Sequence, residues 1–220
     1  MIELQNINKI YRVGASDFYA LKNVSLTVND GEFVSVCGAS GSGKTTLLNI
    51  IGCLDTYESG TYRLDGEDIS KSGDKKRAQI RNSKIGFVLQ DFALINSQTV
   101  LYNVMLPLMF GKCPYGEVKS RALDVLGALG VADQAEKRAN QLSGGQRQRV
   151  AIARAIVNSP SIVLADEPTG QLDSKTGAQT MELLSELNRS GITVIVVTHD
   201  AKVASMAGRI ITVFDGEIAG

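Results

Sequence analysis

A glycine-rich segment near the start of the chain has the residue types and spacing of a phosphate-binding loop. The pattern G-x-x-x-x-G-K-[ST] is matched by Gly38-Ala39-Ser40-Gly41-Ser42-Gly43-Lys44-Thr45. In such a loop successive backbone N–H groups converge on phosphate oxygens, and the positive end of the next helix strengthens their attraction. We expect Lys44 to reach the β- and γ-phosphates of a nucleotide and the Thr45 hydroxyl to bind Mg²⁺. The alternative is a chance match, against which the surrounding elements argue.

Two adjacent carboxylates, Asp166 and Glu167, follow an apolar run over 162–165. Because neighbouring residues of a strand point to opposite faces, we expect the two acids to have different roles. Asp166 suits a ligand of the metal or of its bound water, and Glu167 suits a general base that polarises the attacking water. Pro168 favours an extended conformation at Glu167. By itself such a pair of acids is commonly a solvated turn, but a phosphate loop in the same chain favours the functional interpretation.

A second anion site is indicated by Ser143 and Gln146, which have the spacing of a capping box ahead of a helix expected over 147–157. The amides of Ser143, Gly144 and Gly145 would then face an anion. The alternative is an ordinary capped helix.

His199 is the only histidine of the chain, and it follows the apolar run 193–197. A lone histidine usually has a structural role. Its place at the end of an expected parallel strand, where the sites of α/β proteins gather, favours a functional one.

Alternating and continuous apolar runs predict the elements that position these residues. Alternation over 24–28 and a turn at Asp30-Gly31 indicate antiparallel strands in the first third. Strands buried on both faces, as in a parallel sheet, are expected at 33–37, 85–89, 162–165, 193–197 and 210–214. Helices are expected after the phosphate loop, over 45–51, around 118–129 and around 181–187.

We therefore expect one α/β domain over 1–220, with a core of the P-loop NTPase type and a mainly parallel sheet. Residues 1–90 and 161–220 form this nucleotide-binding core together with an N-terminal antiparallel β subdomain. Strand signals are absent between 91 and 160, where we expect an inserted helical subdomain that carries Ser143.

Composition excludes several classes of protein. Lys plus Arg and Asp plus Glu number 23 each, so no net charge attracts the chain to nucleic acid. The three cysteines have neither disulfide-framework nor zinc spacing, which suits a reducing compartment. No stretch reaches the roughly 20 apolar residues of a membrane span. The N-terminus lacks a signal peptide, so we expect a cytoplasmic protein whose membrane part, if it needs one, comes from another chain.

The segment Leu142-Ser143-Gly144-Gly145-Gln146 resembles the signature sequence of ABC ATPases, and the other motifs of that family follow in order along the whole chain. The resemblance implies that Tyr11 stacks on adenine and that Gln90 contacts Mg²⁺ and water. It also implies that Asp173 lies in a loop that crosses to a second subunit, and that His199 holds the γ-phosphate.

Together these interpretations give three sets of site residues. The catalytic set is Lys44, Gln90, Glu167 and His199. The Mg²⁺ ligands are Thr45, Gln90 and Asp166. The residues expected to contact ATP are Tyr11, Gly38, Ala39, Ser40, Gly41, Ser42, Gly43, Lys44, Thr45, Thr46, Ser143, Gly144, Gly145, Gln146 and Asp173.

The resemblance further implies a head-to-tail homodimer, in which the signature of each subunit closes over the ATP of the other. Within the family the sequence is similar to the MacB/LolD-like group, on the segments 41–48, 54–55, 164–170 and 172–174. Members of that group serve membrane subunits that export or extract peptides, antibiotics or lipoproteins, which implies a peripheral position on the inner face of the membrane. The permease contact is expected around Gln90–Phe110, at Phe92, Leu94, Ile95, Leu106, Leu108 and Met109, with subdomain core as the alternative for each.

Two rival interpretations stay within the family. A non-transport ATPase, acting in a cell-envelope or nucleic-acid-associated process, is disfavoured by the single set of motifs, by the short distance from Lys44 to Ser143 and by the neutral charge. A catalytically dead subunit is disfavoured because Lys44, Asp166, Glu167 and His199 are all present.

Overall fold

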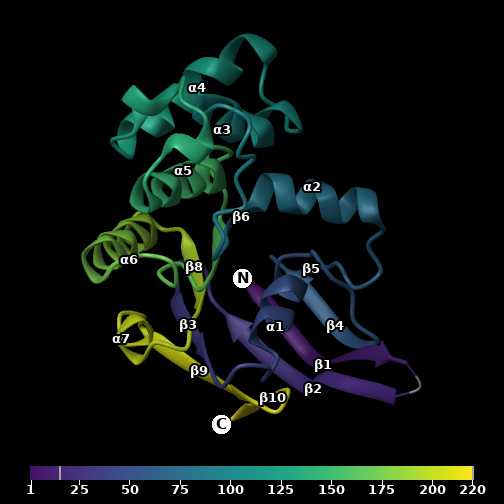
Figure 1. Cartoon of the computed structure of the whole chain (residues 1–220). Coiled ribbons are helices and arrows are strands. Elements are labelled where there is room, and N and C mark those ends of the chain that lie inside the picture. Colours follow the sequence, from purple (N-terminus) through teal and green to yellow (C-terminus); the bar gives the residue numbers. More distant parts are fainter. Residues whose placement is uncertain (15, 220) are drawn as a thin grey trace.

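The computed structural model describes residues 1–14 and 16–219. The N-terminal part is a four-stranded antiparallel sheet of order β2-β1-β4-β5. It lies against α1 on one side of the molecule (Figure 1). Its strands are β1 (Ile2–Val13), β2 (Ser16–Val28), β4 (Ser59–Leu64) and β5 (Glu67–Asp68).

The second sheet has six strands in the order β10-β9-β3-β8-β7-β6. All neighbours in it are parallel except β10, which pairs antiparallel with β9 at the edge. Its strands are β3 (Phe33–Cys37), β6 (Ile85–Val88), β7 (Ile162–Asp166), β8 (Thr193–Val197), β9 (Arg209–Phe214) and β10 (Glu217–Ala219).

The expectation that the last predicted strand is buried on both faces is wrong. In β9 the residues alternate, with Ile211 and Val213 buried while Ile210 and Phe214 are exposed. The reason is its position: β9 is the last parallel strand before the edge, and only one of its faces is covered. A period of two, rather than a continuous run, is the pattern of such a strand.

Helices cover the six-stranded sheet and fill the stretch between β6 and β7 (Figure 1). The helix after the phosphate loop and those around 118–129 and 181–187 are confirmed, and the predicted helix over 147–157 begins earlier, at Gly144. The helices are α1 (Lys44–Ile51), α2 (Asp74–Lys84), α3 (Val100–Met109), α4 (Val118–Ala128), α5 (Gly144–Ile156), α6 (Ser174–Arg189) and α7 (Ala201–Ala204), with short 3₁₀ turns at Tyr115–Glu117, Ala132–Gln134 and Ala139–Gln141.

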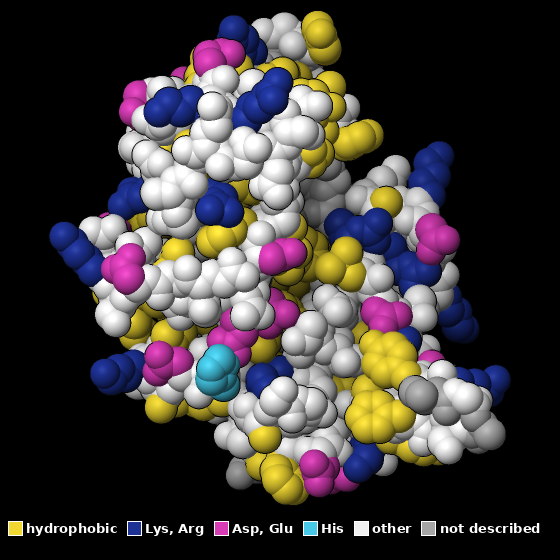
Figure 2. All heavy atoms as spheres, viewed as in Figure 1, with side chains coloured by type: hydrophobic (Ala, Val, Ile, Leu, Met, Phe, Trp, Pro, Cys, Tyr) yellow, Lys and Arg dark blue, Asp and Glu magenta, His cyan; other side chains and the backbone are white. Residues whose placement is uncertain are grey.

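Two apolar cores follow from this arrangement. One lies under α3, α4, α5 and α6 and includes Val150, Val163 and Leu184. The other lies between the N-terminal sheet, α1 and the second sheet, and includes Ile7 and Leu48. Further apolar side chains reach the surface of the molecule on the helical part (Figure 2). Among the described residues no helix is both long and apolar enough to cross a bilayer.

The fold class predicted from the sequence is confirmed: an antiparallel N-terminal sheet, a parallel core sheet and a helical insertion. In the core sheet β8 lies between β3 and β7, and all three strands are parallel. Their carboxyl ends therefore meet at one edge of the sheet, where the site residues lie. The phosphate loop follows β3, Asp166 ends β7, and His199 lies two residues after β8. This edge is where ligands of open α/β sheets bind.

Candidate nucleotide-binding and hydrolysis site

The phosphate loop requires its glycines for steric reasons. Gly38 has φ +154°, and a Cβ there would lie 2.1 Å from the carbonyl oxygen of Val213. Gly43 has φ +105° and caps α1, and a Cβ on it would lie 2.5 Å from the carbonyl oxygen of Ala20. The cap supplies no side-chain acceptor, so the first amides of α1 remain available to an anion.

Lys44 lies at the first position of α1 with its side chain directed back into the loop. Its Nζ donates to the carbonyl oxygens of Gly38, at 3.0 Å, and Ala39, at 2.7 Å. The residue is only 8% exposed. An ammonium has three N–H donors, so these two bonds still leave one for a phosphate oxygen.

Two of the three residues expected to bind the metal, Thr45 and Asp166, converge from two elements. The Thr45 hydroxyl, on α1, donates to Oδ2 of Asp166, at the end of β7, over 3.2 Å. Burial raises the pKa of the Asp166 carboxyl, while the Thr45 hydrogen bond and the charge of Lys44 oppose that rise. One hydroxyl and one carboxylate fit Mg²⁺, which commonly uses one or two protein oxygens together with phosphate and water oxygens. Within the described residues no cluster of three or more histidine, cysteine or acidic side chains could hold a metal without those extra ligands.

Glu167 does not have the extended conformation that Pro168 was expected to favour; its φ is +45°, in the left-handed region. Hydrogen bonds to its backbone N–H and to its carboxylate hold Glu167 in this left-handed conformation. Its N–H donates to the Val197 carbonyl, and its carboxylate accepts from the Thr198 hydroxyl at 3.2 Å and from the His199 amide at 3.0 Å. These bonds offset the roughly 1–2 kcal/mol that a left-handed residue costs.

His199 and Glu167 are in direct contact, which the sequence analysis did not predict. Nδ1 of His199 lies 2.5 Å from Oε1 of Glu167. The Glu167 side chain is 14% exposed, whereas the His199 side chain is 73% exposed. The histidine therefore projects from the sheet edge while the carboxylate lies behind it, next to Asp166.

The capping box at the signature is confirmed. The Ser143 hydroxyl accepts from the Gln146 amide, and the Gln146 side chain accepts from the Ser143 amide. The signature lies away from the phosphate loop of the same chain, because α5 packs on β6 and α3 whereas α1 packs on β2, β7 and β8. The two predicted anion sites therefore belong to different parts of one subunit.

Gln90 lies beside the segment that follows Glu167, and Asp173 lies at the end of that segment, where α6 begins. Gln90 is two residues beyond β6, and a Cβ on Gly170 would lie 3.3 Å from its Nε2. Asp173 caps α6 by accepting from the amides of Lys175 and Thr176. The hydrogen bonds from Thr176 lower the pKa of Asp173. The sequence analysis missed this capping role.

Tyr11 lies on β1, and its ring is 37% exposed. The hydroxyl donates to Oδ2 of Asp55 at 2.8 Å, and the Lys9 ammonium lies 4.8 Å from the ring centroid. Thr46, on α1, also lies at the hydroxyl. Burial and the bond to Asp55 raise the pKa of Tyr11.

Polar residues on the buried side of α5 were missed by sequence reasoning. Gln148, 1% exposed, donates to the Pro168 carbonyl at 2.8 Å. Arg154 donates to the carbonyls of Phe92 and Ala93, which have φ of +62° and +44°. The available signal was that each of the two has apolar residues three or four positions away on the same helix, where a polar side chain needs a buried partner.

The structure corrects part of the predicted partner surface. Phe92 is 5% exposed with the Arg147 guanidinium over its ring, and Leu108 is 1% exposed. Leu94 packs against the helical core. Phe92 and Leu94 are covered because the loop after Gln90 folds back on α5, whereas Leu108 is buried on α3, which packs on α4 and α5. Ile95 and Met109 remain exposed, as do Tyr102 and Phe110, which lie in the expected range but were not named individually, and Tyr115, which lies beyond it.

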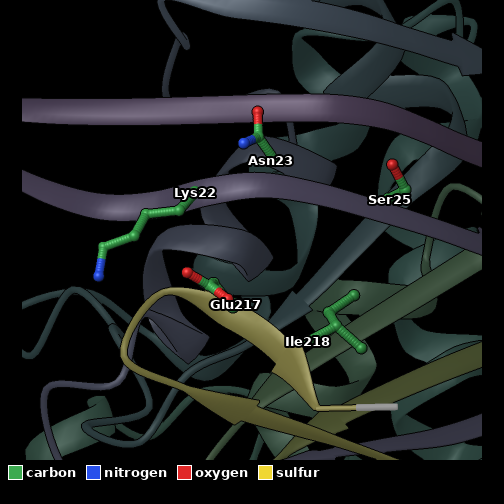
Figure 3. Close-up of a pocket in the computed structure, with 5 residues that line it drawn as sticks. All are labelled: Lys22, Asn23, Ser25, Glu217 and Ile218. Carbon is green, nitrogen blue, oxygen red and sulfur yellow. The ribbon is translucent and has the colours of Figure 1, made fainter.

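One surface hollow, of about 360 Å³, contains none of the predicted site residues. It lies between β2 and β10 (Figure 3), and it is lined by Lys22, Asn23, Ser25, Glu217 and Ile218. Lys44, Asp166 and His199 lie elsewhere, at the carboxyl ends of β3, β7 and β8.

Comparison with known proteins agrees with this geometry. The ABC transporter family matches residues 21–170. The uncharacterized ABC transporter ATP-binding protein YvrO of Bacillus subtilis is 50% identical over 218 residues, which is 99% of this chain and 95% of that protein. The macrolide export ATP-binding/permease protein MacB of Chlorobaculum tepidum is 46% identical over 99% of this chain but only 33% of its own length.

Among solved structures, a dimeric post-hydrolysis state of the ATP-binding cassette MJ0796 bound to ADP and Pi is similar, with a TM-score of 0.92 and 50% identity. The match covers 100% of this chain and 97% of that one. The corresponding protein of Methanocaldococcus jannaschii is an uncharacterized ABC transporter ATP-binding protein, 52% identical over 99% of this chain and 95% of its own length. The chain belongs to the ABC transporter ATP-binding family and is an ATPase of that family.

Proposed function

We propose that the chain hydrolyses ATP with Mg²⁺ at the edge formed by β3, β7 and β8. The observation that carries this assignment is the convergence there of Lys44, Thr45, Asp166, Glu167 and His199 from separate elements. Thr45 and Asp166 would hold the metal, which supplies a positive charge between the phosphates. Gln90, which reaches Gly170, completes the set near the attacking water.

The other roles in hydrolysis are supplied by side chains and backbone amides of the protein. Lys44 and the amides at the start of α1 neutralise charge on the β- and γ-phosphates. Glu167 accepts a proton from the attacking water at its carboxylate. The bonds from Thr198 and the His199 amide fix the direction of that carboxylate. His199, in contact with Glu167 and projecting outward, is placed to donate to the γ-phosphate.

The proposal is tested by the variant Asp166→Asn, which loses the charge of the metal ligand but keeps its size. We expect phosphate release at saturating ATP and millimolar Mg²⁺ to fall by about 10²-fold or more, the scale on which electrostatic contacts act in catalysis. Chelation of Mg²⁺ should abolish hydrolysis by the unchanged protein. Asp124→Asn, at an exposed aspartate on α4, serves as the matched control. Hydrolysis that persists after chelation would refute the metal assignment.

We propose that the working unit is a homodimer with two ATP molecules at the interface. The support is the separation of two anion sites within one subunit: Ser143, Gly144 and Gly145 lie away from Lys44. A signature whose helix packs on other elements than α1 does is free to close over the phosphate loop of a second copy. The similar MJ0796 cassette is described as dimeric.

A membrane subunit is the second partner that we propose, and the chain then lies peripherally on the cytoplasmic face. Exposed apolar side chains surround the end of α3, with Phe110 81% exposed and Met109 46% exposed. Such side chains are typical of a protein contact. The MacB relatives, which combine ATP-binding and permease parts in one protein, support a membrane partner of the exporter type. We propose export or extraction of a peptide, antibiotic or lipoprotein as the work done.

This docking surface predicts the effect of the double substitution Met109→Ser and Phe110→Ser. The isolated protein should keep its basal ATPase, because both side chains are exposed and remote from the phosphate loop. Stimulation by the membrane subunit, measured in vesicles that contain both proteins, should fall by about tenfold or more, since a few central apolar contacts dominate most interfaces. The control is Phe214→Ser, at an equally exposed aromatic on β9. Equal losses in both variants would contradict the assignment of the surface.

A further inference from the structure

Tyr11 is not free to turn, because its hydroxyl is anchored. The hydroxyl donates to Oδ2 of Asp55 at 2.8 Å, and Oδ1 of the same carboxylate accepts from Lys9 Nζ at 2.9 Å. One carboxylate therefore joins two residues that lie two positions apart, on the same face of β1. Burial alone would raise the pKa of Asp55, but the hydrogen bonds from Lys9 and Tyr11 outweigh it and lower the pKa, so the anion is maintained.

The same network leaves only one face of the ring for a ligand. The Lys9 ammonium lies over the ring, 4.8 Å from its centroid, and Lys9 itself is 5% exposed. The lysine therefore covers the inner face of Tyr11. The exposed part of the ring, 37% of the residue, must lie on the opposite face and the edge. A cation over one face of an aromatic ring holds it in place without occupying the other face.

Asp55 is also tied to the phosphate loop. It lies four residues after the end of α1, and its amide donates to the carbonyl of Asn49 in that helix at 3.3 Å. The helix begins with Lys44 and Thr45, which belong to the phosphate site. One helix thus fixes the phosphate-binding amides at its start and the orientation of Tyr11 just beyond its end.

We propose that Asp55, together with Lys9, is a positioning residue that fixes the Tyr11 ring at the distance and angle at which a purine base stacks on its outer face. This inference rests on the proposed function and deepens it. It explains how the position of the base is fixed relative to that of the triphosphate. A ring that is already oriented loses little entropy when the base binds, so the network increases affinity without touching the nucleotide.

The decisive variant is Tyr11→Phe, which removes the anchor and keeps the stacking ring. We expect the KM for ATP to rise about three- to tenfold, the factor that one hydrogen bond contributes. The kcat should be unchanged, because Lys44, Asp166 and Glu167 are unaffected. The inhibition constant of Mg²⁺-tripolyphosphate, a competitor that has the phosphates but no base, should also be unchanged. A merely structural defect would alter all three quantities.

Two variants of Asp55 test the acceptor side of the same hydrogen bond. Asp55→Asn keeps an acceptor for the Tyr11 hydroxyl and should stay within about twofold of the unchanged KM, whereas Asp55→Leu keeps none and should match Tyr11→Phe. Asp55→Leu also leaves the Lys9 ammonium without its partner, which lowers the folding stability of that variant. The test of the proposal is therefore Tyr11→Phe, which leaves the Lys9–Asp55 pair in place. The control is Tyr19→Phe, which removes another hydroxyl from the β1–β2 hairpin and should change nothing.

Three results would overturn the proposal: an unchanged KM for ATP in Tyr11→Phe, an equal loss of tripolyphosphate inhibition, or a KM for Asp55→Asn as high as that for Asp55→Leu. If Tyr11→Ala, which deletes the ring, also leaves the KM for ATP unchanged, the stacking role itself fails. The proposed hydrolysis fails separately, and visibly, if the unchanged protein releases no phosphate from ATP.

Discussion

The Glu167→Gln variant should bind ATP but nearly cease to hydrolyse it. Glutamine keeps the shape of the side chain and can still accept from Thr198 and the His199 amide, so the left-handed conformation at this position should persist. It cannot accept a proton from water. General-base catalysis contributes about 10²–10⁴ in rate, and the steady-state kcat should fall by that factor.

The same variant should accumulate as a dimer in the presence of ATP. If two subunits share each nucleotide, and hydrolysis reopens the interface, then a subunit that binds without hydrolysing should remain closed. The measurement is light scattering of Glu167→Gln with and without ATP and Mg²⁺, over a range of protein concentrations. The unchanged protein should be mainly monomeric in the same experiment. Ser143→Arg, added to Glu167→Gln, should abolish the trapped dimer by obstructing the signature.

The matched control for the chemistry is Glu186→Gln, a substitution of the same kind on α6, outside the site. Turnover near the unchanged rate in Glu167→Gln would rule out the general-base role. A Glu167→Gln protein that binds ATP yet stays monomeric at high concentration would count against the shared site, while leaving the base assignment intact.

The second large effect is expected for Lys44→Ala, which should lose ATP affinity and hydrolysis together. Removing one charged donor from a phosphate site costs about 10²–10³ in rate. Here the loss is compounded, because the ammonium also holds the carbonyls of Gly38 and Ala39. Binding is measured by equilibrium dialysis with labelled ATP, and activity by phosphate release.

Lys175→Ala, at an exposed position on α6, is the control for the loss of one positive charge. Thermal unfolding without nucleotide separates a local defect from a global one: both variants should unfold near the temperature of the unchanged protein. Hydrolysis by Lys44→Ala at the unchanged rate would remove the phosphate loop from the mechanism.

Much of the site could be predicted because its residues lie at strand ends and helix starts, which have strong local signals. The glycines before Lys44 have a spacing that only a tight loop requires, and the capping pair Ser143 and Gln146 is likewise local. The apolar runs that end at Asp166 and before His199 place both residues at the same edge, once the sheet is taken to be parallel.

The rest depended on tertiary contacts that no local pattern reveals. Helix α2 was missed because only Ile80 of its eleven residues is buried, so it has no apolar stripe. The φ of Glu167 follows from hydrogen bonds to β8 and the residues after it, about thirty positions along the chain. The core position of Phe92 requires α5 to fold back over the loop, and the role of Asp55 requires β1 to lie beside the end of α1.

Helix α5 connects several parts of the molecule. It starts at the signature, holds Pro168 through Gln148, and holds the backbone after Gln90 through Arg154. Gln148 lies in the second turn of the helix and Arg154 in its last, so a tilt of α5 would move at least one of the two backbone segments that they hold. If the proposed membrane subunit docks at α3, which packs on α5, its movement would reach the segments that follow Gln90 and Glu167 together. Coupling of that movement to hydrolysis would then pass through this one helix, without a separate relay.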